Sequence, residues 1–378
     1  MADAELRSLL LSGVAQWNEW RETHADVPLD LAGANLRGTN LAGANLAGAD
    51  LTGALLFKTD LSGANLTEAT LTEAKLFGTN LTGANLTGAS LAGAILEKAL
   101  LAEAILARVD LAQRDLSRAR LTGANLTEAN LAGTNLERAN LSSANLSGAV
   151  LARANLIGAT LAQTVLHEAD LFKVNFSGAT LSGAVLTRAN LGEANLYGVN
   201  LNEANLDGAV LDGAILSRAN LSQAMLNGAQ LNRAFLDEAN LSGAVLADAS
   251  LSKADLDGAI LARTNLARAN LARTNLAERD LIGANLAGAT LRDANLAGAN
   301  LAEANVQQAN LTGADLTGAN LARANFAGAN LAEATLHDIQ RWHEVTSYQD
   351  TNIYMVQSPP KDFFFFARSK GAVETPPS

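Results

Sequence analysis

The dominant pattern in the chain is a large apolar residue at every fifth position. From Leu31 to Leu336 this register holds at 62 consecutive positions, and 59 of them are leucine. The residue two places before each is small, and alanine fills 49 of the 61 such positions from Ala34 to Ala334. A period of five matches neither the 3.6-residue turn of an α-helix nor the two-residue alternation of a β-strand. So sustained a repeat decides the architecture before any local propensity does.

We therefore expect a coil that bends once in each pentad, with leucine and alanine on a narrow axis and the other three residues facing water. Asn or Asp precedes most leucines, and these residues suit the bends because they tolerate left-handed backbone and hydrogen-bond their own backbone. Thr39, Thr59 and Thr79 are the first three non-alanine residues at the small position, and they lie twenty residues apart. Phe57 and Phe77 share that spacing. The spacing predicts four pentads in each coil.

Runs such as ANLAGANLAGADL follow the pattern A(N/D)LxG, and the region from residue 31 to 336 resembles the pentapeptide repeat proteins. This resemblance implies a β solenoid, namely a right-handed quadrilateral β-helix with about 15 coils of four pentapeptides each. Such a fold is stabilised by the stacking of many coils, so no single coil is expected to fold alone.

The two ends of the chain depart from the repeat, and three segments follow. Residues 1–30 are predicted to form an N-terminal capping helix and a linker, 31–336 the β-helix, and 337–378 a C-terminal cap with a short helix and a flexible tail. The apolar residues within 3–23 fall on one face of a single helix, which would cover the open edge of the first coil. After Leu336 the register is lost, and Trp342, Val345, Ile353 and Tyr354 predict an irregular packed cap.

The predicted C-terminal helix begins at Pro360, ends near Gly371 and contains four phenylalanines in a row. They cannot all lie on one helix face. In one interpretation two or three of them pack on the last coil. In the other, the rest join a second copy end to end as a homodimer. The candidate contact residues are Phe363, Phe364, Phe365 and Phe366.

Composition argues against most kinds of chemistry. The chain has no cysteine and a net charge of −11, of which −6 falls on the repeats. This balance disfavours direct nucleic-acid binding, which needs a basic surface. No apolar run approaches 18 residues and no signal-peptide pattern is present, so we expect a cytoplasmic protein with no membrane contact. His167 has no second histidine near it, and no phosphate-binding loop motif occurs. We predict no catalytic residue, no metal site and no cofactor, and therefore no enzyme.

Two arginines occupy the small inward position, and each precedes an aspartate. Arg114 is followed by Asp115, and Arg279 by Asp280. Because an unpaired buried arginine is very costly, we expect the coil to bulge locally and turn the guanidinium outward. Buried pairing with the neighbouring aspartate is the second interpretation, and a functional kink is the third.

Positions equal modulo twenty stack into columns, so the four faces of the coil can be compared. The face centred on Leu41 and Leu61 is bland, whereas the face centred on Leu56 and Leu76 carries apolar and basic side chains, which predicts an interface. Drift at tolerant outward positions is the alternative. The candidate face comprises Leu55, Phe57, Lys58, Phe77, Ile95, Lys98, Arg118, Arg138, Ile157, Tyr197, Ile215 and Phe235. Another column repeats a basic residue every twenty positions and is equally explained by solvated side chains. It consists of Arg233, Lys253 and Arg273.

The favoured function is a non-catalytic protein-interaction scaffold or regulatory binding module with an unknown protein partner. The resemblance also implies an alternative, because some pentapeptide repeat proteins mimic DNA and bind type II topoisomerases, which protects these enzymes from quinolones or toxins. The mild acidity and the basic columns of this chain depart from that pattern. Gyrase binding is therefore kept as the alternative.

Overall fold

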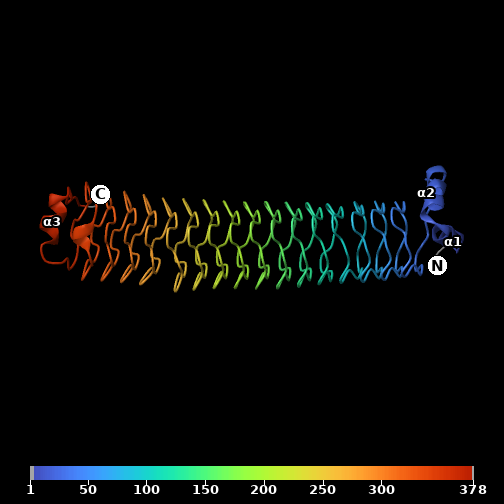
Figure 1. The fold of residues 1–378 in the computed structure, drawn as a ribbon, viewed down its shortest axis with the longest axis horizontal. Helices are drawn as coiled ribbons and strands as arrows, with labels where there is room; N and C mark the ends of the chain where they lie inside the picture. The colour runs from blue at the N-terminus through green and yellow to red at the C-terminus, as the bar shows by residue number, and fades with distance from the viewer. Residues whose placement is uncertain (1–3, 377–378) are drawn as a thin grey trace. The chain divides into compact units, whose positions relative to one another are not determined.

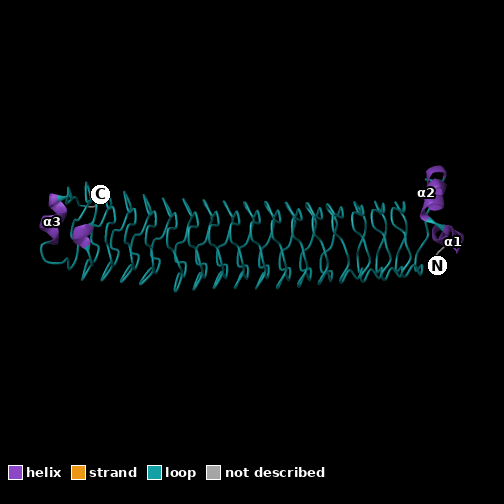
Figure 2. Cartoon of the chain, in the orientation of Figure 1, coloured by secondary structure: helices purple, strands orange, loops and turns teal. Residues whose placement is uncertain are grey.

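The computed structural model describes residues 4–376 of the chain. The chain divides into two compact units, Met1–Asn190 and Leu191–Ser378, and in each of them it winds through successive coils (Figure 1). Over the described residues the coils are joined by isolated parallel β-bridges and contain no extended strand. Figure 2 shows helices near the chain termini and loops and turns through the coils.

Each pentad makes one tight turn. The N–H of Ala34 donates to the carbonyl of Leu31 at 3.0 Å, and Gly33 between them has φ of +68°. A positive φ at the third residue is the signature of a type II turn and favours glycine. Longer side chains occupy the same turn position in other pentads, as Lys58 does with φ of +55°. The repeat therefore imposes the left-handed conformation on residues that rarely adopt it.

The role expected for Asn and Asp is half right. They do not occupy the left-handed position, because that position falls two residues after the leucine. Asp30 instead forms a parallel bridge with Asp50, and its Oδ1 accepts the N–H of Ala32 at 3.0 Å. The predicted hydrogen bond to nearby backbone is thus confirmed, with the N–H two residues ahead as the donor, and the predicted backbone conformation is wrong.

The twenty-residue coil is confirmed, because bridges join residues twenty apart throughout both units. Leucine and alanine are buried on the axis, as the pattern predicts. The inward threonines after Thr39 are buried too: Thr59 donates its hydroxyl to the carbonyl of Leu36 at 2.7 Å, and Thr79 donates to Leu56 at 2.5 Å. A hydroxyl therefore fits the alanine position because the preceding coil supplies an acceptor.

Outside the axis, the Asn and Asp side chains form ladders along the coils. Asn80 Nδ2 donates to Asp60 Oδ1 at 2.9 Å, twenty residues away. Hydrogen bonds from the hydroxyl and the N–H of Ser62 lower the pKa of the Asp60 carboxyl, and the bond from Asn80 acts in the same direction. These bonds tie each coil to the next at its corners.

Two helices, not one, precede the first coil. α1 spans Ala4–Ser12 and α2 spans Val14–Thr23. Between them Gly13 has φ of +149° and ψ of +144°, a conformation that other residues rarely adopt. The prediction of a single helix over 3–23 was wrong because glycine in the middle of the apolar pattern ends the first helix.

α2 supplies hydrogen bonds to the first coil. Trp17 is fully buried, and its Nε1 donates to the carbonyl of Asn45 at 2.8 Å. Asn18 accepts the N–H of Asn45 at 2.8 Å and donates to the carbonyl of Gly43 at 2.9 Å. In later coils the N–H of the equivalent residue donates to the preceding coil. The helix side chains therefore replace the backbone partners that the first coil lacks.

At the other end the coil continues beyond Leu336, contrary to the expectation. Asn330 forms a bridge with Asn352, twenty-two residues ahead, and Asn325 with Ser347 at the same spacing. Tyr348 is fully buried at the position that leucine occupies elsewhere. The sequence hides this register because two extra residues are accommodated around the short 3-10 helix η1, Trp342–Glu344.

Helix α3, Phe363–Ser369, follows this last coil. It begins three residues later than predicted, after Asp362 with φ of +65°, and Gly371 with φ of +95° follows its end. Val373 then returns to the coil, where it accepts the N–H of Ile353 at 2.8 Å. Segments after the helix thus cover part of the open coil edge.

Arg114 and Arg279 do not make their coils bulge. The turn closes normally at both, from Arg114 N–H to Leu111 at 3.1 Å and from Arg279 N–H to Leu276 at 3.2 Å. Instead, each loosens the contact with the preceding coil, and six N–H groups near each arginine form no close backbone hydrogen bond among the described residues. The loosening is smaller near Arg279, where the parallel bridges Asp255–Asn275 and Ile260–Asp280 still join the two coils. The twelve N–H groups belong to Gly88, Leu91, Gly93, Leu96, Asp110 and Asp115 near Arg114, and to Lys253, Leu256, Gly258, Leu261, Asn275 and Asp280 near Arg279.

Each guanidinium lies at the loosened boundary between its coil and the preceding one, which we call the opened seam. Arg114 Nε donates to the carbonyl of Ala112 at 3.1 Å beside a cavity of about 90 Å³. Arg279 Nε donates to Ala277 at 2.8 Å, and its Nη2 lies 3.2 Å from Oδ1 of Asp257. Only 13% of the Arg279 side chain is exposed. Its carboxylate partner belongs to the previous coil, so the pairing with Asp280 was also the wrong interpretation.

Candidate interaction surface

The first unit places aromatic and aliphatic side chains of the candidate face on neighbouring coils. Parallel bridges join Leu55 to Lys75 and Lys75 to Ile95, so these residues stack in one column. Phe57 and Phe77 lie in the adjacent outward column, and both are half-buried. Ile95 is 39% exposed. The structure thus brings the first members of the predicted face together on one side of the coil.

Cations cover both aromatic rings. The Arg37 guanidinium lies 5.1 Å from the centroid of Phe57, and Lys98 Nζ lies 4.9 Å from the centroid of Phe77. Such contacts are attractive because the ring face is electron-rich. We call this set the basic aromatic strip. It comprises Arg37, Leu55, Phe57, Lys58, Lys75, Phe77, Ile95 and Lys98.

Further along the same face, three cations follow one another in the turn column. They are Lys98, Arg118 and Arg138, and all three are exposed. Lys98 pairs with Glu97 at 3.2 Å and Arg138 with Glu137 at 3.7 Å, while Ile157 is exposed on the coil beyond. Exposed pairs of this kind contribute little free energy. The face is therefore apolar and basic, with its cations only weakly engaged.

In the second unit the predicted residues form a separate apolar patch. Ile215 and Phe235 stack through a parallel bridge, and Phe235 is 49% exposed. The hydroxyl of Tyr197 accepts a hydrogen bond from Arg218 at 3.2 Å. Arg218 also binds Glu238 at 2.9 Å, and this hydrogen bond raises the pKa of the arginine.

The four phenylalanines of α3 divide into two pairs. Phe363 is buried, and its ring centroid lies 5.9 Å from that of Tyr348. Phe366 packs against Trp342 with centroids 5.2 Å apart. Phe364 is partly exposed, and Phe365 is 82% exposed. Only the second pair is free to contact another molecule.

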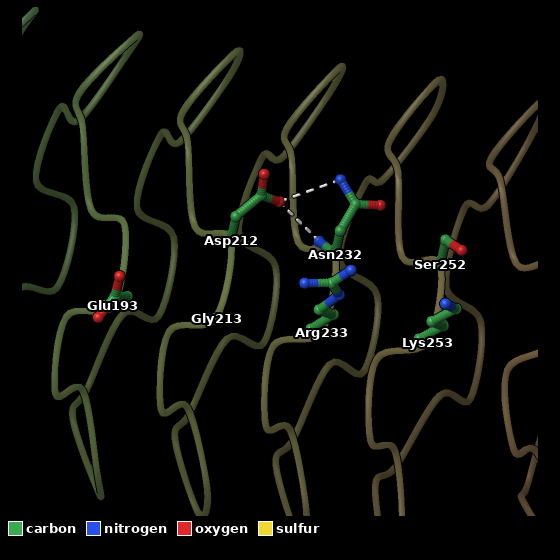
Figure 3. A pocket seen from close by; sticks show the side chains of 7 residues that line it. All are labelled: Glu193, Asp212, Gly213, Asn232, Arg233, Ser252 and Lys253. Atoms are coloured by element: carbon green, nitrogen blue, oxygen red, sulfur yellow. Dashed lines mark hydrogen bonds between the residues drawn. The ribbon is translucent and has the colours of Figure 1, made fainter.

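A groove in the second unit was not among the predicted sites. It has a volume of about 560 Å³ and is lined by Glu193, Asp212, Gly213, Asn232, Arg233, Ser252 and Lys253 (Figure 3). Its floor opens at Gly213, which has no side chain between Glu193 and Arg233 in the same turn column. That gap, beside two stacked cations, is the sequence signal that could have revealed it.

Little else in the structure suggests reactive chemistry. His167 Nδ1 lies 2.7 Å from the Thr187 hydroxyl, and its Nε2 lies 3.5 Å from Glu168. Across residues 4–376 no three His, Asp or Glu side chains gather as metal ligands would. No helix in that range is long and apolar enough to cross a membrane.

The described coils define a solenoid of five-residue repeats. The family model named Pentapeptide repeats matches overlapping segments that together cover residues 30–261 and 280–340. The chain belongs to the pentapeptide repeat family, whose fold is the right-handed quadrilateral β-helix. No curated protein sequence matches it.

Several solved pentapeptide repeat structures are similar to this chain. HetL from the cyanobacterium Nostoc, described as involved in heterocyst differentiation regulation, is 32% identical over 65% of this chain and 89% of its own, with a TM-score of 0.20. QnrB1, a plasmid-mediated fluoroquinolone resistance protein, is 19% identical over 50% and 92%, with a TM-score of 0.29. A protein from the Arabidopsis thaliana thylakoid lumen is 29% identical over 30% and 66%, with a TM-score of 0.21.

Proposed function

We propose that this protein is a non-catalytic interaction module whose basic aromatic strip binds an acidic surface of a protein partner. The observation that carries the proposal is the stacking of Phe57 and Phe77 on adjacent coils, each beneath a cation. Apolar side chains in a row with a charged surround are typical of interfaces.

The charge of this side specifies the kind of partner. Its outward columns carry six basic residues, Arg37, Lys58, Lys75, Lys98, Arg118 and Arg138, against the three acidic residues Glu97, Asp115 and Glu137. The chain as a whole has a charge of −11, so this local excess is opposite in sign. Complementary charge increases the association rate and suppresses wrong partners. An acidic partner with apolar side chains would contact both the rings and the cations.

Mimicry of DNA is less well supported than this binding role. A DNA mimic presents uninterrupted acidic columns, whereas the carboxylates here often pair with arginine on the next coil, as Glu128 does with Arg108 at 2.8 Å. A gyrase supercoiling assay distinguishes the two functions. We expect neither inhibition by the protein nor protection from a quinolone, and either effect would favour the topoisomerase alternative.

The proposal is tested by purifying partners from cells that make the protein, with wild type and two double variants. Phe57→Ser with Phe77→Ser removes both rings, whereas Ile105→Ser with Val150→Ser removes two exposed apolar side chains from other columns. Phe57 and Phe77 lie outside the axis, so circular dichroism should show both variants folded. At low salt we expect the wild type and the Ile105/Val150 control to recover acidic proteins. The Phe57/Phe77 variant should fail to recover them. Equal recovery with all three would refute the role of the strip.

A further inference from the structure

Arginines at the turn position follow a pairing rule in this solenoid. Each of several such arginines forms an ion pair with a carboxylate at the same turn position, twenty residues away. The pairs are Arg108–Glu128, Arg188–Glu168, Arg218–Glu238, Arg268–Asp248, Arg273–Asp293 and Arg323–Glu303. The carboxylate lies on the next coil in some pairs and on the preceding coil in others. Other turn cations, such as Arg118 and Arg263, have no carboxylate twenty residues away in either direction.

Arg233 and Lys253 are two turn cations without such a carboxylate on successive coils. Gly213 lies twenty residues before Arg233, and Lys253 lies twenty after it, so neither side offers a carboxylate in this column. Within the described chain neither cation forms an ion pair. Adjacent coils are separated by about 4.8 Å, the spacing of hydrogen-bonded strands, so two like charges are held close together. An anion placed between them would relieve that repulsion.

The same two residues line the groove that Gly213 opens. Figure 3 shows Arg233 and Lys253 on successive coils, with Ser252 beside them and no side chain at Gly213. An added Cβ at Gly213 would meet only Glu193 Cγ, at 3.7 Å. The space next to the Arg233 guanidinium is therefore open to a ligand.

A neutral hydrogen-bond donor, the Ser252 hydroxyl, adjoins the cations. The hydroxyl of Ser252 has no hydrogen bond to a protein group in the described structure, and the same is true of the N–H of Lys253. In the second unit the other residues of this column, such as Arg233 and Arg273, donate their N–H to the next coil. The N–H of Lys253 belongs to this column and therefore faces the next coil, on the side away from Arg233. The two cations and the Ser252 hydroxyl thus lie at one edge of the groove.

The acidic wall of the groove is already engaged. Asp212 Oδ1 accepts the N–H of Asn232 at 2.8 Å and its Nδ2 at 3.0 Å, as the dashed lines in Figure 3 show. These bonds hold the Asp212 carboxylate beside Asn232, at the Gly213 end of the groove. A ligand with a hydroxyl or amine next to its anionic group would contact both ends.

We propose that Arg233, Lys253 and Ser252 form a binding site for a phosphate monoester. Arginine offers a planar fork that matches phosphate oxygens, and lysine adds a point charge. The phosphate group belongs either to a small molecule or to a phosphorylated side chain of a protein. This site lies in the second unit and is independent of the basic aromatic strip.

Titration calorimetry of the full chain at low salt tests the site with three probes. These are inorganic phosphate, a phosphoserine peptide and the same peptide without phosphate. We expect the phosphopeptide to bind and its unphosphorylated twin to fail. Affinity for inorganic phosphate within tenfold of that for the phosphopeptide indicates a small-molecule source, and a larger preference for the phosphopeptide indicates a protein source. Absence of binding by both phosphate probes overturns the proposal.

Variants assign the binding to these residues. Arg233→Gln with Lys253→Gln should weaken phosphate binding at least tenfold. Arg263→Gln is the matched control, because Arg263 is also a turn cation between two glycines and lies outside the groove. Gly213→Gln should weaken binding by filling the groove with a neutral side chain. Unchanged affinity in the double variant, or an equal loss with Arg263→Gln, would show that the phosphate binds elsewhere.

Discussion

We predict that removing the arginine at the opened seam, Arg114, increases the stability of the protein. Replacing Arg114 with alanine removes a partly buried arginine and its hydrogen bond to Ala112. The variant nevertheless should be more stable, because alanine fits the axis at this position in most pentads. Once the arginine is gone, the coil can close onto its predecessor as the other coils do.

The size of the gain follows from the six N–H groups that form no close backbone hydrogen bond near Arg114. A backbone hydrogen bond contributes about 0.5–1.5 kcal/mol net of its exchange with water, so six contribute about 3–9 kcal/mol. Loss of the bond from Arg114 Nε subtracts about 1 kcal/mol. Closure of the cavity of about 90 Å³ adds a further favourable contribution. We expect a net local stabilisation of at least about 2 kcal/mol, which allows for incomplete closure.

Hydrogen exchange measured by mass spectrometry is the suitable assay, because repeat proteins open locally and a single melting temperature averages over the coils. Peptides covering residues 86–115 should exchange at least about tenfold more slowly in Arg114→Ala, since each 1.4 kcal/mol changes the opening constant tenfold. Arg120→Ala, an exposed arginine outside the axis, is the control and should leave exchange unchanged. Ala129→Arg should open a new seam. Faster or unchanged exchange in Arg114→Ala would refute the reasoning.

Three further predictions concern the ends of the chain. Trp17→Ala should destabilise the first coil by about 3–5 kcal/mol, since a fully buried ring and its bond to Asn45 are lost. Hydrogen exchange of residues 31–50 should therefore be faster than in the wild type, and an unchanged rate would contradict this prediction. Burial raises the pKa of the Tyr348 phenol above its ordinary value of about 10, so its contribution to stability is complete below pH 10 and is lost as pH rises further. Tyr348→Phe should abolish that alkaline loss in denaturant titrations at pH 9 and 11, and an equal loss in both proteins would refute it. We expect Phe365→Ser to convert an end-to-end dimer into a monomer in light scattering without loss of folding, whereas a wild type that stays monomeric at high concentration excludes the dimer.

The inferred surface function was partly accessible from the repeat alone. Because the coil period places residues twenty apart in one column, the sequence alone assigns Phe57 and Phe77 to one side of the coil. Their cation contacts could not be assigned in this way, because Arg37 and Lys98 reach the rings from turn positions one coil away. Long side chains have many rotamers, and only the stacked neighbours decide which one is used.

The left-handed turns show a similar division. The pentad predicted one bend per repeat, and the structure contains it. Chemical preference then suggested Asn and Asp for the left-handed residue, yet the solenoid most often places glycine there. Elsewhere it places mainly glutamate, lysine or arginine, as at Lys58, and aspartate at only a few positions such as Asp248. The strain of that conformation is a local cost, and it is offset by backbone bonds to the coils on either side.

The sequence by itself determined the period, the axis and the outward columns of this protein. It could do so because burial of leucine and alanine acts on each pentad alike and needs no distant information. Only the tertiary structure decided how Arg114 and Arg279 are accommodated, how the coil continues past Leu336, and which phenylalanines of α3 stay exposed. Each of those outcomes depends on contacts between coils or between a helix and a coil, where one insertion or one long side chain changes the partners of many backbone groups.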